Sequence, residues 1–351
     1  MPVQFILPNG LPHTDALVAA ATMARRMGVQ YVVGMGAGGV LECAKVVAAL
    51  LTHTGTPKEF CREMGGGKQF EHDSLPTVLV PTVPTSLEFD TNGHALFGAE
   101  ALFQLKLQQS SQRYVLWDPA LLSTAVGSPL ASTCAATMAH AACAFIEASV
   151  QAGSADSARA ALGVAGVRTA HSAVKGLLQH STAAATDGSN EALDAVAAAS
   201  LHTSASMQAC PGNVARAVGI GAVGRYRLHY SEVVGGLVGD VLGLFADSVL
   251  EAVDSSDGAK RHNMQRASDA VEYLQKLFVE HSGGAASAGT PLAEAVALWA
   301  ASLPLPSIHD HDLSAADFER MATAAEGDPH MLGSVMPLQR SAVLDMLSNA
   351  R

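Results

Sequence analysis

The sequence predicts an α/β domain built on a parallel sheet, followed by an all-helical domain. In the first third of the chain, short apolar segments alternate with amphipathic ones, the pattern of strands covered by helices. From about Pro119 onward, strand-like segments disappear and alanine-rich segments of helical periodicity take over. Aromatic residues make up 5% of the chain, which favours closely packed helices over a β sandwich. We therefore expect an α/β domain over residues 1–119 and an all-helical domain over residues 120–351.

The expected elements of the first domain follow from the spacing of its apolar residues. Two amphipathic segments, residues 14–27 and 40–51, repeat apolar residues at helical spacing. Four short apolar segments are the expected strands, at residues 3–7, 31–33, 77–80 and 114–117. Because buried parallel strands are continuously apolar rather than alternating, these segments predict a parallel sheet with helices on its faces.

The second domain contains a series of expected helices. The long ones cover residues 130–150, 155–178, 189–207, 231–253 and 262–281, and shorter ones cover residues 291–302, 314–325 and 338–349. Ser314 and Asp317 are spaced as a capping box at the start of one late helix.

Charge and cysteine content exclude several classes of protein. The net charge is −11 and the Lys and Arg residues are scattered, so we expect no nucleic-acid-binding face. No segment reaches the roughly twenty apolar residues of a membrane span, and no targeting signal is visible. The five cysteines include no CxxC pair, which is typical of reduced, structural thiols. We expect an intracellular protein, either cytoplasmic or mitochondrial.

Residues 31–45 form a strand, a glycine turn and a helix. Glycine lets the backbone approach a phosphate closely, and the following helix directs its free N–H groups at the anion. The spacing differs from GxGxxG, so a tight turn of any α/β protein remains an equally good interpretation. A second glycine cluster, Gly65 to Lys68, follows no clear strand, and we expect it to be a surface loop.

Two segments of the first domain resemble motifs of one enzyme family. Gly36-Ala37-Gly38-Gly39, followed by Glu42 and Lys45, resembles the GGGSxxDxxK signature of the iron-containing alcohol dehydrogenases. Residues 81–88, PTVPTSLE, resemble the PTTxAGSE segment of that family and are closer in length to its maleylacetate reductase branch.

Two further segments follow in the family's order. Residues 114–119, YVLWDP, resemble the strand and turn that enter the helical domain, and residues 306–340 resemble the closing pattern of a helix, a DP turn and a final helix. The resemblance implies a dehydroquinate synthase-like architecture, with the active site between a nucleotide-binding domain and an all-helical domain. Residues 1–9 align after the family's first βαβ unit, so the resemblance implies a sheet truncated at its N-terminus.

The resemblance also implies a site for NAD(P). The residues that match the family's cofactor-binding motifs are Gly36, Ala37, Gly38, Gly39, Lys45, Thr82 and Thr85. Leu87 stands where the family has a small residue beside the nicotinamide ring, and its bulk would partly fill that space.

The metal site of the family is mostly absent from this sequence. The family holds iron or zinc on one Asp and three His of the helical domain, because several converging ligands must offset the dehydration of the ion. Counted from Asp118-Pro119, the Asp position falls on Ala136 and the first His position on His140. One imidazole cannot retain a catalytic divalent ion, so we expect no bound metal. His140 alone is either a weak ligand candidate or a buried, hydrogen-bonded side chain.

The remaining ligand positions fall on other residue types. Arg216 and Ile220 occupy the two positions of the family's HxxxH motif, and Tyr230 occupies the last ligand position. A shift of one residue would make His229 a ligand instead. In one interpretation, the positive charge of Arg216 replaces the metal and polarises a carbonyl or binds a carboxylate substrate, with Tyr230 as a hydrogen-bond donor. In the other, Arg216 fills an inactive site or pairs with Glu232 or Asp240.

Two functions remain open from the sequence. The first is a catalytically impaired pseudoenzyme with a structural or assembly role, as a homo-oligomer or a subunit of a larger complex. The second is an active, metal-independent NAD(P)-dependent oxidoreductase for a small alcohol, aldehyde or keto acid, with His140, Arg216 and Tyr230 as its catalytic residues.

Overall fold

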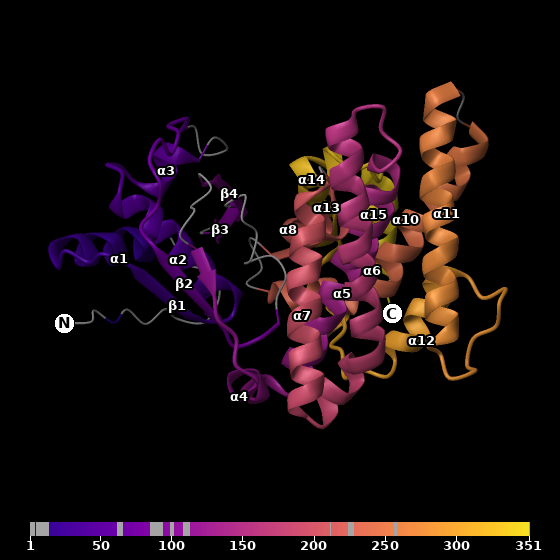
Figure 1. Ribbon diagram of the computed structural model, residues 1–351. Helices are drawn as coiled ribbons and strands as arrows, with labels where there is room; N and C mark the ends of the chain where they lie inside the picture. The colour runs from indigo at the N-terminus through magenta and orange to yellow at the C-terminus, as the bar shows by residue number, and fades with distance from the viewer. Residues whose placement is uncertain are drawn as a thin grey trace. The chain divides into compact units, whose positions relative to one another are not determined.

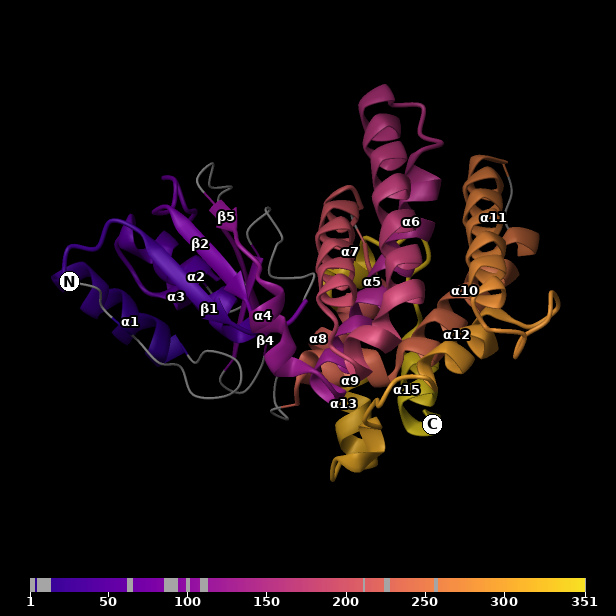
Figure 2. The same ribbon diagram turned by 60° about the horizontal axis from the view of Figure 1, so that its bottom comes forward.

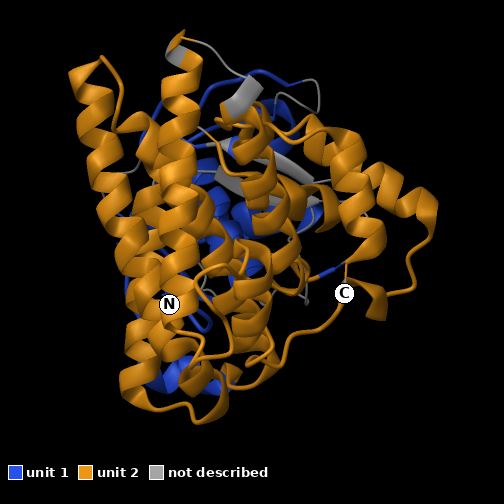
Figure 3. Ribbon diagram, turned by 90° about the vertical axis from the view of Figure 1, so that its right-hand side faces the viewer, with its two compact units in different colours: residues 1–124, 224–228 blue, residues 125–223, 229–351 orange. Residues whose placement is uncertain are grey.

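The computed structural model describes residue 4 and residues 14–61, 66–84, 94–98, 102–107, 113–210, 212–223, 228–255 and 258–350 (Figure 1). The chain forms two compact units, which Figure 3 shows in different colours. Unit 1 comprises residues 1–124 and 224–228, and unit 2 comprises residues 125–223 and 229–351. The expected strand at residues 3–7 lies outside the described residues apart from residue 4.

Unit 1 contains a three-stranded parallel sheet in the order β1-β2-β5, formed by Val32–Gly36, Thr77–Pro81 and Arg113–Val115. In its register, Val33 pairs with Val78, and Val78 pairs with Tyr114. The parallel sheet predicted from the apolar segments is therefore confirmed. A short antiparallel hairpin, β3 (His94–Gly98) with β4 (Leu102–Lys106), was not predicted.

Helix α2 (Gly38–Leu51) packs on β1 and β2, and α1 (Thr14–Arg26) packs on α2 (Figure 2). The contact between α2 and the sheet is close because Gly34 has no side chain: a Cβ there would lie 2.6 Å from Cβ of Ala44. Leu41 and Ala44 of α2 pack on Leu79 of β2. The short helix α3 (Pro57–Phe60) follows α2.

Unit 2 is built around α5 (Ser128–Gln151), which contacts α6, α7, α8, α9, α10 and α11. Its side chains are buried continuously from Leu130 to Ala148, as expected for a helix that is apolar on all sides. By length and composition α5 also resembles a membrane span, but 94% of that stretch is buried inside the protein. Its apolar surface is therefore covered by the other helices.

The other helices of unit 2 match most of the predicted segments. Helices α6 and α7 lie side by side (Figures 1 and 2). The bounds are α6 Ser157–Thr186, α7 Asn190–Gln208, α8 Val214–Val223, α9 Tyr230–Gly236, α10 Val238–Ser255, α11 Gly258–Glu280, α12 Leu292–Ala300, α13 Ala315–Glu326, α14 Pro329–Leu332 and α15 Arg340–Asn349. A short helix α4, Pro119–Leu122, precedes them, with 3-10 turns at Ser123–Ala125 and Ile308–Asp310.

The helix expected over residues 231–253 is broken. It forms α9 and α10, whose axes differ by 58°. The break follows Gly235 and Gly236, and paired glycines are a common cause of helix kinks. Gly235 is held against α5, because a Cβ on it would lie 2.6 Å from the carbonyl oxygen of Ser132. Apolar periodicity alone did not show this break.

Candidate functional site

Unit 2 brings together the three residues expected to form the reaction centre. His140 of α5 and Tyr230 of α9 are joined by a hydrogen bond of 3.0 Å between Nε2 and the phenol oxygen. Arg216 of α8 lies near enough to His140 to change its pKa, and the Tyr230 hydroxyl lies 3.5 Å from the Arg216 carbonyl oxygen. His140 and Arg216 are buried and Tyr230 is half-buried.

The charge state of His140 follows from this environment. Burial, and secondly the positive charge of Arg216, lower the pKa of His140 to about 3. The imidazole is therefore neutral at physiological pH, with one nitrogen donating and the other accepting. Nε2 of His140 accepts a hydrogen bond from the Tyr230 hydroxyl in one tautomer and donates one to the Tyr230 oxygen in the other.

Asn213, which the sequence did not identify, connects two of these residues. Its side-chain Nδ2 donates to the carbonyl oxygen of His140 at 3.1 Å, and its Oδ1 accepts from the backbone N–H of Arg216 at 3.0 Å. Asn213 thus caps the start of α8 and ties it to α5 at the same point. An Asn directly before an apolar segment was the available signal, but α8 itself was not predicted.

Gly219 of α8 sets the position of Tyr230. A Cβ at residue 219 would lie 2.6 Å from Cε2 of Tyr230 and 2.4 Å from Cγ2 of Val234. These distances are shorter than any real contact, so α9 approaches α8 closely only because residue 219 is glycine. This approach allows the Tyr230 hydroxyl to reach His140.

We predict that Gly219→Ala destabilises the protein by about 1–3 kcal/mol through overpacking. The matched control is Gly176→Ala in the middle of α6, where the added Cβ would have its nearest neighbour at 3.6 Å. Alanine there gains helix propensity, so the control is expected to be neutral or more stable by up to about 1 kcal/mol. Urea unfolding of the two variants measures both values, and equal stabilities would contradict the close approach.

The structure also describes the other residues that the resemblance aligned with the family's metal ligands or beside them. Ala136 lies one turn before His140 on α5, and Ile220 is an apolar residue of α8. His229 is exposed at the N-cap position of α9 and does not share the contact that Tyr230 makes with His140. Among the described residues, no group of three or more His, Cys, Asp and Glu side chains could hold a metal ion.

The glycine turn of unit 1 joins β1 to α2. Gly36 has a φ of 152°, in the region that favours glycine. Ala37 is the N-cap residue of α2 and offers no side-chain hydrogen bond to the helix. The first N–H groups of an α-helix lack partners within it, so this end can bind an anion. Thr82, directly after β2, lies beside the turn and donates its N–H to the Gly36 carbonyl oxygen at 3.1 Å.

Lys45, expected from the resemblance to bind the cofactor, lies inside α2. It is fully buried, and its Nζ forms an ion pair of 2.8 Å with Glu42 Oε1 within α2. The other residues of the turn, Gly38 and Gly39, form the first turn of α2. Thr85 and Leu87 lie outside the described residues.

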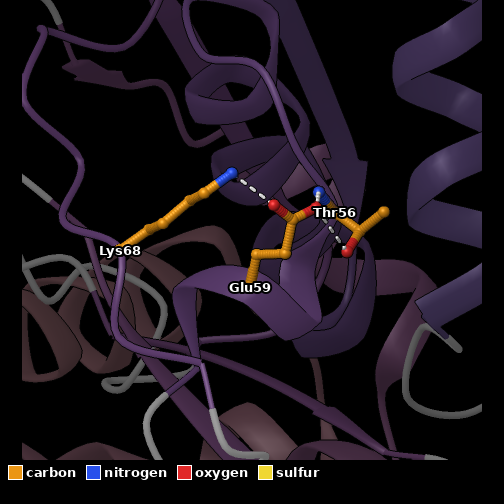
Figure 4. Close-up of polar contacts among 3 residues, drawn as sticks. All are labelled: Thr56, Glu59 and Lys68. Atoms are coloured by element: carbon orange, nitrogen blue, oxygen red, sulfur yellow. Dashed lines mark hydrogen bonds and ion pairs between the residues drawn. The ribbon is translucent and has the colours of Figure 1, made fainter.

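The described part of the second glycine cluster, residues 66–68, forms hydrogen bonds with α3 and the residue after it, and Gly65 lies outside the described residues. The N–H groups of Gly67 and Lys68 donate to the Glu59 carbonyl oxygen at 2.9 and 3.0 Å. The Glu59 carboxylate accepts from the Thr56 N–H at 2.9 Å and from the Lys68 ammonium, which lowers the pKa of Glu59 (Figure 4). Because the N–H groups of residues 66–68 are already bonded, this part of the turn is a poor candidate for phosphate binding.

Glu147 is a buried carboxyl of unit 2 that was not predicted from the sequence. It lies on α5, and its oxygens accept from the Ser334 hydroxyl and from the Val335 N–H at 3.0 Å. Burial raises the pKa of Glu147 to about 7, although these hydrogen bonds oppose the shift. The sequence feature that could have identified Glu147 is its position as a single charged residue in the alanine-rich helix α5.

The cysteines do not form a reactive site in this structure. All five are free, and four of them are buried. Burial raises the pKa of Cys43, Cys134 and Cys143 to about 12, so these thiols are protonated at neutral pH. Protonated, enclosed thiols are poor nucleophiles, in agreement with a structural role.

Comparisons with known proteins agree with the resemblance predicted from the sequence. The family model described as iron-containing alcohol dehydrogenase matches residues 7–94. No curated protein sequence shows significant similarity to the chain.

Similar solved structures cover nearly the whole chain. An archaeal halo-thermophilic Red Sea brine pool alcohol dehydrogenase is 13% identical, with a TM-score of 0.71 over 99% of this chain and 84% of its own. An NADH-dependent butanol dehydrogenase A from Thermotoga maritima is 17% identical, with a TM-score of 0.69 over 97% and 81%. A sulfoacetaldehyde reductase from Bifidobacterium kashiwanohense, solved with NAD+, is 15% identical, with a TM-score of 0.68 over 98% and 82%. The α/β and all-helical fold class is therefore confirmed.

Proposed function

We propose that this chain, which has the fold of the iron-containing alcohol dehydrogenases, lacks their metal-dependent catalysis and serves as a structural or assembly subunit. The observation that carries this proposal is the position of Arg216, whose charge acts on His140 and whose carbonyl oxygen lies 3.5 Å from the Tyr230 hydroxyl. A divalent ion needs several neutral or anionic ligands converging on one point, and a guanidinium there repels it. Burial is the larger cause of the lowered pKa of His140, and the charge of Arg216 lowers that pKa further.

The residues around His140 do not fit the metal of the family. The Asp position is Ala136, and the imidazole of His140 is bonded to Tyr230. His229, the alternative ligand, is exposed at the start of α9. No catalytic step is therefore assigned to a metal. Separately, we propose that the chain divides into an α/β domain over residues 1–119 and an all-helical domain over residues 120–351.

The glycine turn fits the pyrophosphate of NAD(P) better. Residues 36–39 and the uncapped N-terminus of α2 supply backbone N–H groups to a phosphate, with Thr82 beside them. We assign Lys45 a structural role, because its ion pair with Glu42 already engages its charge. When bound, the nicotinamide cofactor supplies or accepts a hydride. Thr85 stays a proposed contact from the resemblance alone.

We predict that Ala37→Asp weakens NAD(P)H binding at least tenfold while stabilising the protein. An aspartate at the N-cap accepts from the N–H groups of the first turn, which is worth about 1 kcal/mol, and its charge repels the phosphates. Calorimetric titration measures the affinity and thermal unfolding the stability. Because the variant is expected to be more stable than the wild type, lost binding cannot be attributed to misfolding. Unchanged affinity would place the cofactor elsewhere.

The proposed loss of metal catalysis is tested by turnover. The protein is stripped with chelator and supplied with iron(II) or zinc under anaerobic conditions, and oxidation of NADH or NADPH is followed with small aldehydes. We expect no metal-dependent rate. Turnover that requires the added ion, and that disappears in His140→Ala, would overturn the proposal.

A metal-independent oxidoreductase is the second candidate, because Tyr230 is bonded to His140 near a fixed positive charge. In that case Tyr230 donates a proton to a substrate oxygen while Arg216 stabilises the developing negative charge. The substrate class is a small alcohol, aldehyde or keto acid. Turnover in chelated protein that is lost in Tyr230→Phe, with cofactor affinity unchanged, would favour this candidate over the first.

We further propose that the protein is intracellular, cytoplasmic or mitochondrial, and acts as a homo-oligomer or as a subunit of a larger complex. The free, buried cysteines support a reducing compartment.

A further inference from the structure

Helix α6 carries positive charge on its exposed face and has no Asp or Glu between its two cap residues. Its buried side packs on α5 and α7 (Figures 1 and 2). Its exposed side carries a row of residues spaced by three or four positions, which lie on one face of a helix. These residues are Val164, Arg168, His171 and Lys175, and we call them the α6 stripe. Val164 and Arg168 are exposed, and His171 and Lys175 are half-buried.

The cations of the α6 stripe are not neutralised within the described residues, where neither Arg168 nor Lys175 forms an ion pair. The stripe borders Tyr273 of α11, whose hydroxyl oxygen lies 2.9 Å from Nε2 of His171. Burial, and secondly the positive charge of Lys175, lower the pKa of His171. The neighbouring charge that acts on this imidazole is therefore a cation. This face is locally positive in a chain whose net charge is −11.

We propose that the α6 stripe binds an acidic amphipathic helix of a partner protein. The inference rests on the assembly role proposed above and names the chemistry of the partner. Arg168 and Lys175 are seven residues apart, which is about 10.5 Å along the helix axis. A partner helix with carboxylates seven residues apart presents them at the same spacing, so both ion pairs form when the two helices lie side by side.

Charge and apolar surface together favour a protein over a nucleic acid as the partner. The net charge of −11 repels a long polyanion, whereas a short acidic helix brings few charges to the rest of the surface. Val164 is 45% exposed, and Ala161 and Ala165 on the same side of α6 are exposed too. Leucines of an amphipathic helix cover such apolar side chains, which a phosphate backbone does not.

The test uses a fluorescein-labelled helical peptide of three heptads, with two glutamates and two leucines in each heptad and alanine elsewhere. Its binding to the full chain is followed by fluorescence anisotropy at low ionic strength. We expect saturable binding that added salt weakens. The double variant Arg168→Glu, Lys175→Glu is expected to bind about tenfold more weakly, because like charges then face each other. The matched control is Arg261→Glu, Lys276→Glu, the same charge change at exposed residues of α11, with an expected effect of less than about twofold.

Absence of saturable binding to the wild type, or equal weakening in the two double variants, would overturn the proposal. Tighter binding of a single-stranded DNA oligonucleotide, lost in Arg168→Glu, Lys175→Glu, would assign the α6 stripe to a nucleic acid instead. A wild-type dimer that these substitutions dissociate would assign it to a second copy of the chain. Circular dichroism and thermal unfolding show whether the variants are folded. If the double variant misfolds, Arg168→Gln, Lys175→Gln replaces it and is expected to weaken binding about threefold or more.

The peptide titration and the turnover assay fail independently. Metal-dependent turnover would refute the assembly role and leave the measured affinity for the peptide as it is. Lost peptide binding in a protein without turnover would refute only the inference about the α6 stripe.

Discussion

Replacing Glu147 with glutamine is expected to make the protein about 3 kcal/mol more stable than the wild type at pH 8, and no more stable at pH 4. Burial raises the pKa of Glu147 from its ordinary value of 4.5 to about 7 in the folded state. Below pH 4.5 the carboxyl is protonated in both states, and it contributes its full stability. As the pH rises from 4.5 to 7, the unfolded chain ionises first, and wild-type stability falls.

Glutamine removes the titration and keeps the hydrogen bonds that Oε1 accepts, but its amide nitrogen cannot accept from the Val335 N–H as Oε2 of Glu147 does at 3.0 Å. Its carbonyl oxygen accepts from the Ser334 hydroxyl and the Val335 N–H, as Oε1 of Glu147 does. Urea unfolding at pH 4, 6 and 8 measures the difference between the two proteins. The control is Glu272→Gln, an exposed carboxylate of α11 that is expected to leave the pH dependence unchanged. Parallel stability curves for wild type and Glu147→Gln would contradict the burial of this carboxyl.

Restoring the ligand set is expected to create a metal site. The triple variant Ala136→Asp, Arg216→His, Tyr230→His places an Asp and two His around the native His140. Ala136 and His140 are four residues apart on α5 and share a face. Four such ligands are a complete set for zinc. We expect about one zinc ion per chain after dialysis, and a melting temperature that rises with zinc concentration.

The matched control keeps the arginine. The double variant Ala136→Asp, Tyr230→His has three ligands together with the Arg216 guanidinium and is expected to bind at least a hundredfold more weakly, a difference of about 2.7 kcal/mol. Equal zinc affinity of the double and triple variants would show that Arg216 is not the excluding group. A folded triple variant without zinc would show that these four positions do not converge.

The fold was predictable where periodicity was long and uninterrupted. Helices α5, α6 and α7 extend over many turns of alanine-rich sequence, and the strands β1 and β2 are compact apolar segments. Helix α8 is short and contains two glycines, so the helix propensity of this segment was too low to predict a helix from the sequence. Its helical form depends on contacts with α5, α9 and α13 that the sequence does not display.

The candidate site was predictable in part for a different reason. The family's spacing pointed to His140, Arg216 and Tyr230. In the structure His140 is hydrogen-bonded to Tyr230, and the charge of Arg216 acts on His140. Spacing could not show whether Tyr230 or His229 faces His140, because a one-residue shift changes the face of a helix. Nor could it show Asn213, whose role depends on two elements far apart in the sequence.

The most direct test of the central claim is the metal content of the wild-type protein. The protein is stripped with chelator, incubated with excess iron(II) or zinc, and dialysed. Inductively coupled plasma mass spectrometry then measures the number of metal ions per chain. If Arg216 excludes the ion, metal stays well below one per chain, and Arg216→His alone raises it only slightly because Ala136 and Tyr230 remain. Near-stoichiometric metal in the wild type, lost in His140→Ala, would contradict the account and identify an intact metal-dependent dehydrogenase.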